Sequence, residues 1–176
     1  MRKYHPFLVT LHWLMVLMIP LSLTAGGIIL ANLPNDDPAK VTFLGGHMGF
    51  GLTIGAVLLV RLITRIRSTH PARATTGNEF LDRISLWTHW GFYALIGGMV
   101  LTGLATALGA GLLPIVFAGS GDPLPATFDG LPQLFLHGFC AVLLIALIVL
   151  HLLAALYHQF ILKDGLMARM WYGKRD

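Results

Sequence analysis

Four long apolar stretches constrain the fold of this chain more than any other feature of its sequence. Each reaches the ~20 residues that a helix needs to cross a hydrocarbon core about 30 Å thick. Lipid offers no partner to free backbone groups, and nothing here alternates like the strands of a membrane barrel, so we expect helices. The predicted spans are residues 7–31, 43–63, 86–108 and 134–162.

The composition agrees with a membrane environment. Of the 176 residues, 56% are hydrophobic and 11% are charged, whereas a typical soluble domain carries about 25% charged residues. The first stretch follows Arg2 and Lys3 but exceeds the ~7–15 apolar residues of a signal peptide, so we expect a retained span. We therefore predict a single transmembrane domain over residues 1–176, an all-α integral membrane four-helix bundle.

Charge is distributed unevenly between the two sides of the predicted bundle. All but Lys40 of the 12 Lys and Arg residues lie near the N-terminus, between the second and third spans, or after the fourth. The other two loops carry Asp36, Asp37, Asp122 and Asp129. By the positive-inside rule, both termini are expected to face the cytoplasm. Basic residues in short loops beside apolar runs indicate topology and contact with anionic lipid, and they do not indicate a nucleic-acid site.

Histidine is frequent for a membrane protein, with eight in the chain. Ionisable side chains are costly within a bilayer and usually face the bundle interior, where they have a partner or a function. Any one of them taken alone is as easily an interfacial or hydrogen-bonding residue. The histidines in or at the ends of the predicted spans are His12, His47, His89, His137, His151 and His158.

The spacing of four histidines arranges them in two pairs. His137 and His151 are 14 residues apart, which places them within ~40° of one helix face and ~21 Å apart along its axis. His137 shares the outer depth with His47 on the second span, and His151 shares the inner depth with His12 on the first. The sequence therefore predicts one facing pair of imidazoles in each leaflet.

Two imidazoles that face each other across a bundle form the axial arrangement of a low-spin haem iron. The iron of such a haem has no open coordination position, so the haem carries electrons and does not bind oxygen. Two such sites, one in each leaflet, would transfer electrons from one membrane face to the other. At the inner site His158 is an alternative to His151, because it follows seven residues later within ~20° of the same stripe, and His89 is a weaker one. Attachment is expected to be non-covalent, because Cys140 is the only cysteine and no Cys-x-x-Cys-His motif is present.

Glycines crowd the same spans, and two explanations stay open. Missing side chains leave room for a flat macrocycle, or they let helices pack closely, as in many membrane bundles. The glycines concerned are Gly45, Gly46, Gly49, Gly51, Gly55, Gly91, Gly97, Gly98, Gly103 and Gly138.

Short motifs containing these histidines are similar to those of a known family. They are Tyr4-His5-Pro6, Leu11-His12-Trp13-Leu14, Gly46-His47-Met48-Gly49, Leu59-Val60-Arg61-Leu62, His89-Trp90-Gly91-Phe92-Tyr93, Leu136-His137-Gly138 and Leu150-His151-Leu152 through Tyr157-His158. In their order and spacing they resemble the bacterial cytochrome b-561 family, over nearly the whole chain. The resemblance implies a multi-pass protein of the bacterial inner membrane that holds two non-covalent b haems.

The resemblance also implies site residues and partners. It maps the axial ligands onto His12, His47, His137 and His151, and it implies ubiquinone as electron partner. One branch of the family resembles a superoxide oxidase, which takes an electron from superoxide at the periplasmic face. Lys40, seven residues before His47, is the candidate to attract that anion, although an ordinary solvated lysine is the simpler explanation.

Further candidates lie on the basic side of the bundle. Arg61 and Arg73 are placed to pair with haem propionates, although such arginines more often fix topology and meet lipid headgroups. His89 and His158 are candidates for a quinone site, because a quinone needs a proton with each electron and histidine relays protons near neutrality.

The leading functional hypothesis is therefore a membrane oxidoreductase that moves electrons between superoxide, two haems and ubiquinone. One alternative is a haem-bearing anchor subunit that passes electrons from a dehydrogenase or hydrogenase to quinone. Another is a haem-free transporter whose histidines relay protons, which the lack of acidic residues within the predicted spans argues against.

Overall fold

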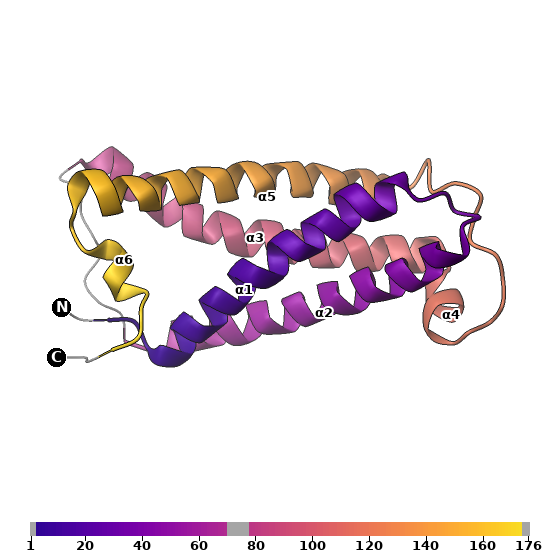
Figure 1. Cartoon of the computed structure of the whole chain (residues 1–176), viewed down its shortest axis with the longest axis horizontal. Helices are drawn as coiled ribbons and strands as arrows, with labels where there is room; N and C mark the ends of the chain where they lie inside the picture. Colours follow the sequence, from indigo (N-terminus) through magenta and orange to yellow (C-terminus); the bar gives the residue numbers. More distant parts are fainter. Residues whose placement is uncertain (1–2, 70–77, 174–176) are drawn as a thin grey trace.

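The computed structural model describes residues 3–69 and 78–173, and it is an elongated bundle of helices (Figure 1). No strand occurs in these residues. The four helical segments able to cross a membrane confirm the all-helical, four-span prediction. They are α1 (Pro6–Thr24) continued by a π-helix, η1 (Ala25–Leu30); α2 (Pro38–Arg67); α3 (Glu79–Gly109); and α5 (Pro132–Tyr157) continued by a second π-helix, η2 (His158–Leu162).

Polar caps and prolines fix where the spans begin. Proline stands at the start of α1, α2 and α5, where its missing N–H has no helical partner to lose. The Asp37 carboxylate accepts a hydrogen bond from the Ala39 N–H at 2.8 Å, and the Asn78 side chain accepts one from the Phe80 N–H at 2.9 Å. As a result α2 and α3 begin well before the apolar residues that predicted them at positions 43 and 86.

The helices form two antiparallel pairs (Figure 1). α1 packs mainly on α2, α3 packs along α5, and α2 joins the pairs by packing on α3. The start of α1 and the short α6 (Leu166–Arg169) lie at one end of the bundle, the terminal end. The short α4 (Leu112–Phe117) and the segment that follows it lie at the other, the loop end. Within the segment between the third and fourth spans, α4 packs against α2 and α3.

The buried core sits midway along the bundle and draws on all four spans. It consists of Met15, Met18, Ile54, Leu58, Ile96 and Leu144, and it is entirely apolar. Leu144 lies halfway between His137 and His151 on α5, so the core separates the two predicted histidine depths. Outside the core, large apolar side chains are exposed over most of the described surface, which suits a lipid solvent.

Candidate functional site: two pairs of facing histidines

The loop-end pair joins α2 to α5. The ring centres of His47 and His137 are 6.2 Å apart and their planes lie at 79°. The Nδ1 atom of His137 lies 2.9 Å from the Met99 carbonyl oxygen, with the Thr102 hydroxyl at 3.2 Å. Because a carbonyl only accepts, Nδ1 carries the proton, and Nε2 is the nitrogen left to bind a metal.

Two glycines hold the loop-end imidazoles closely. A Cβ on Gly26, in η1, would lie 2.9 Å from His47 Cε1, and a Cβ on Gly103, in α3, would lie 3.1 Å from His137 Cε1. The Nδ1 atom of His47 is buried and has no hydrogen-bond partner within the described part of the chain. Any side chain larger than hydrogen at Gly26 would therefore push the His47 ring out of its position.

The terminal-end pair joins α1 to α5. The ring centres of His12 and His151 are 6.4 Å apart and their planes lie at 77°. Aromatic rings surround the pair, with Trp13 at 5.4 Å from His12 and Phe92 at 5.3 Å from His151. A third imidazole, His89 of α3, lies 5.8 Å from His151.

Positive charge accompanies the terminal-end pair. Arg61 lies within electrostatic range of His12, His89 and His151. Its guanidinium donates a 3.0 Å hydrogen bond to the Leu8 carbonyl, one turn before His12. The guanidinium also interacts with the Tyr93 side chain, and its five N–H donors exceed the needs of these two partners.

Both pairs have the dimensions of a bis-imidazole metal site. Ring centres on opposite sides of one metal ion lie roughly 6 Å apart, because each metal–nitrogen bond is about 2 Å and the nitrogen is about 1 Å from its ring centre. The observed 6.2 and 6.4 Å agree with this separation. Near-perpendicular ring planes are compatible with it too, since each ring can rotate about the axis of its own bond. The residues therefore fit axial ligation of a haem iron at each end.

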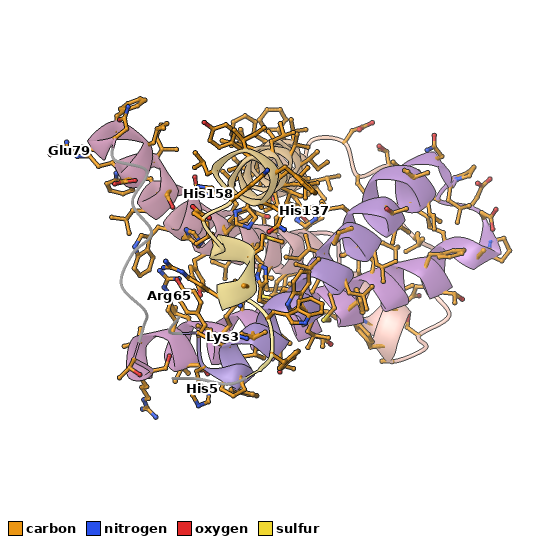
Figure 2. The ribbon with its side chains drawn as sticks, turned by 60° about the vertical axis from the view of Figure 1, so that its left-hand side comes forward. Lys3, His5, Arg65, Glu79, His137 and His158 are labelled. Carbon is orange, nitrogen blue, oxygen red and sulfur yellow. The ribbon has the colours of Figure 1, made fainter. Side chains whose placement is uncertain are left out.

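The other predicted residues occupy different surroundings. His158 is bonded through Nδ1 to the Asp164 carboxylate at 2.5 Å, so His151, and not His158, is the α5 histidine that faces His12. Figure 2, which brings the terminal end forward, shows His158 at that end and His137 farther back. Arg73 lies outside the described residues.

Lys40 is not the exposed cation that its sequence position suggested. Its side chain is 5% exposed, and the ammonium donates hydrogen bonds to the carbonyls of Leu30 and Leu33, where the first span ends. The charge is thus held at the C-terminal end of a helix, where the backbone dipole favours a cation. It lies ~10 Å along α2 from His47 and on the same face.

The glycines predicted from the sequence have different surroundings in the structure. A Cβ would press on a neighbouring helix or on α4 at some positions and would meet nothing within 4 Å at others. The first group is Gly45, Gly55 and Gly91, and the second is Gly46, Gly49, Gly51 and Gly138. The first group thus serves close packing, whereas no part of the described chain packs against the second group. Gly26 was not among the glycines predicted from the sequence, although the Gly26-Gly27 pair within the first span was an available signal.

Comparison with known proteins agrees with this geometry. A profile of the prokaryotic cytochrome b561 family matches residues 3–173. The chain belongs to the prokaryotic cytochrome b561 family. It is also 26% identical over 180 residues to a probable superoxide oxidase, CybB, of Yersinia pestis, with 99% of this chain and 98% of that relative covered. The chain is therefore an electron-transferring membrane oxidoreductase that binds haem b, spanning the bacterial inner membrane several times.

Proposed function

We propose that this cytochrome holds two non-covalent b haems, one at each end of the bundle, and transfers electrons between its two faces and ubiquinone. The observation that carries the proposal is the presence of two facing imidazole pairs, 6.2 and 6.4 Å apart between ring centres, at two depths. The proposed axial ligands are His47 with His137 and His12 with His151. Each haem, when bound, supplies reversible one-electron chemistry.

The apolar core between the pairs supports electron transfer over proton transfer. Leu58, Ile96, Leu144 and the other three residues of the buried core have side chains that neither donate nor accept protons. Electrons can cross such a layer, whereas a proton requires a chain of polar groups or water. This observation favours the cytochrome over a proton-relaying transporter.

Arginine provides the counter-charge for haem propionates at the terminal end. Arg61 lies near His12, His89 and His151 and donates a hydrogen bond to the Leu8 carbonyl. It also interacts with Tyr93. A guanidinium forms two parallel bonds with a carboxylate and so suits a propionate. Arg73 remains a second candidate for this role.

Quinone is proposed to react at the terminal end, which is expected to face the cytoplasm by the positive-inside rule. His158 is the stronger candidate for supplying the proton, because Asp164 lies at 2.5 Å and can stabilise the charged imidazole during transfer. His89 is the second candidate, although its Nδ1 is already engaged by the Ser85 carbonyl at 2.7 Å.

Superoxide is proposed as the electron donor at the loop end, in line with the name of the Yersinia pestis relative, a probable superoxide oxidase. Lys40 would contribute through its fixed charge two turns from His47, and not by direct contact, because its ammonium is buried against two carbonyls. A buried cation is screened less by salt than an exposed one and still raises the local potential for an anion.

The test is a reduced-minus-oxidised visible spectrum of the purified protein, with haem quantified as pyridine haemochrome. Two b haems per chain, reduced by an enzymatic superoxide source and reoxidised by a soluble ubiquinone analogue, is the expected result. A colourless protein would refute the proposal. Two haems that are not reduced by superoxide but are reduced by a co-purifying dehydrogenase subunit would indicate a membrane anchor instead.

A further inference from the structure

The third imidazole at the terminal end has a position that the axial pairs do not explain. His89 lies 5.8 Å from His151 between ring centres, and the two ring planes are at 86°. Its Nδ1 atom lies 2.7 Å from the carbonyl oxygen of Ser85, one turn earlier on α3. A carbonyl only accepts, so Nδ1 carries the proton and Nε2 of His89 is left as an acceptor.

Equivalent backbone carbonyls of α3 accept hydrogen bonds from different histidines at the two ends of the bundle. His137 and His151 are 14 residues apart on α5, and Met99 and Ser85 are 14 residues apart on the antiparallel α3. The Met99 carbonyl accepts the Nδ1–H of His137 at the loop end. The corresponding carbonyl at the terminal end, Ser85, accepts from His89 instead.

The interposed ring offers His151 a different partner. A histidine that binds a metal through Nε2 carries its proton on Nδ1 and donates it to a neighbouring acceptor. At the loop end that acceptor is an amide oxygen. At the terminal end the nearest imidazole acceptor is His89, with its ring centre 5.8 Å from that of His151. An N–H···N bond of ~2.9 Å would require the two rings to turn edge to edge and to approach each other by ~0.6 Å.

We propose that His89 is a positioning residue that accepts the Nδ1–H of His151 and thereby tunes the terminal-end haem. The inference rests on the proposed function, because it presupposes a haem bound by His151. An imidazole nitrogen is a stronger base than an amide oxygen, so the bond makes His151 a more electron-donating ligand. More donation favours the oxidised iron and lowers the reduction potential of this haem relative to the loop-end haem.

The experiment is a redox titration of the full-length protein, followed at the haem absorption bands and by the low-spin electron paramagnetic resonance signals. His89→Leu removes the acceptor, and His89→Gln keeps one. We expect His89→Leu to retain both haems and raise the midpoint potential of one. The expected size is at least tenfold in the oxidised-to-reduced ratio at fixed potential, or ~59 mV for one electron. His89→Gln should return most of that shift.

A matched control variant at the loop end shows which of the two midpoint potentials belongs to which haem. Thr102→Val removes the hydroxyl beside His137 Nδ1 but leaves the Met99 carbonyl in place. It should perturb the haem that His89→Leu leaves unchanged. Should His89→Leu fail to assemble, His89→Phe keeps a ring of similar size without the acceptor.

Three results would overturn the inference. In the first, both potentials and both resonance signals stay unchanged in His89→Leu. In the second, His89→Leu converts the terminal-end haem to a high-spin form while His12→Leu does not, which would make His89 an axial ligand. In the third, the wild-type protein contains no haem, and this result would refute the proposed function as well. By contrast, two haems whose midpoint potentials are the same in wild type and His89→Leu would refute only this inference.

Discussion

The two ends of the bundle hold their histidine pairs at nearly the same separation, 6.2 Å at the loop end and 6.4 Å at the terminal end, but in different surroundings. Around His47 and His137 the neighbours are glycine and neutral backbone carbonyl. Around His12 and His151 they are another imidazole, aromatic rings and a guanidinium.

This difference shows that ligand spacing and ligand environment are separate properties of the fold. Two pairs of facing imidazoles with the same separation can form two metal sites with the same ligands. The hydrogen bonds, charges and packing around them decide how each site behaves. The loop end restrains its ligands by close steric contact, whereas the terminal end surrounds them with groups that carry charge or protons. Four experiments test this contrast, beginning with the largest expected effect.

Removing one ligand at each end should have the largest effect. His47→Leu and His12→Leu are each expected to lower haem content from two per chain to one, because a single imidazole holds a haem much less well than two. Pyridine haemochrome quantification and the low-temperature spectrum of each variant measure this outcome. If either substitution removed both haems, the two sites would not be independent and the comparison would fail.

Crowding the loop-end ligand should have the next largest effect. In Gly26→Ala the new Cβ would lie 2.9 Å from His47 Cε1, so the imidazole must move and retention of the loop-end haem should weaken roughly tenfold or more. Gly27→Ala is the matched control, because a Cβ there meets nothing within 4 Å. Haem loss to a competing apoprotein would measure the difference, and equal behaviour of the two variants would contradict the steric role of Gly26.

Removing the buried loop-end cation should reduce stability more than it reduces haem content. Lys40→Met leaves the Leu30 and Leu33 carbonyls without their donor, which is expected to cost about 1–3 kcal/mol. Thermal unfolding followed by haem absorbance would show a lower Tm with two haems still bound. A proposed role in attracting superoxide predicts, in addition, a slower reduction of the haems at low ionic strength. Unchanged stability would show that the two carbonyls find other donors.

The smallest effect is expected from the acidic partner at the terminal end. Burial by itself raises the pKa of Asp164, but hydrogen bonds from His158 and from the Leu166 N–H outweigh it, so the pKa lies below its ordinary value. The stabilisation is therefore present above the unfolded-state pKa of the carboxyl and is lost as the pH falls through the folded-state value. Asp164→Asn should remove less than ~1 kcal/mol near neutral pH and flatten the acid limb of the stability profile. An unchanged acid limb would argue against the ion pair.

Much of the architecture was predictable from the sequence because it follows from helix length and periodicity. Apolar runs of membrane length predicted four spans, and the 14-residue interval between His137 and His151 set their depths on one helix face. Matching depth paired His47 with His137, whereas His158 stayed an alternative to His151 at the inner site until the structure placed His151 opposite His12. The span boundaries were less accurate, because polar caps such as Asp37 and Asn78 extend helices beyond the apolar residues that reveal them.

The sequence by itself thus determined the membrane-spanning class, the number of membrane-spanning helices and the relative positions of the imidazoles along them. Only the tertiary structure decided that Gly26 lies against His47, that Lys40 bonds the end of the first span, and that His89 takes the carbonyl of Ser85. These contacts depend on how each helix rotates and crosses its neighbours. In lipid that choice comes from packing and interhelical hydrogen bonds, since apolar burial does not favour one helix face over another. Periodicity along one helix does not contain that information.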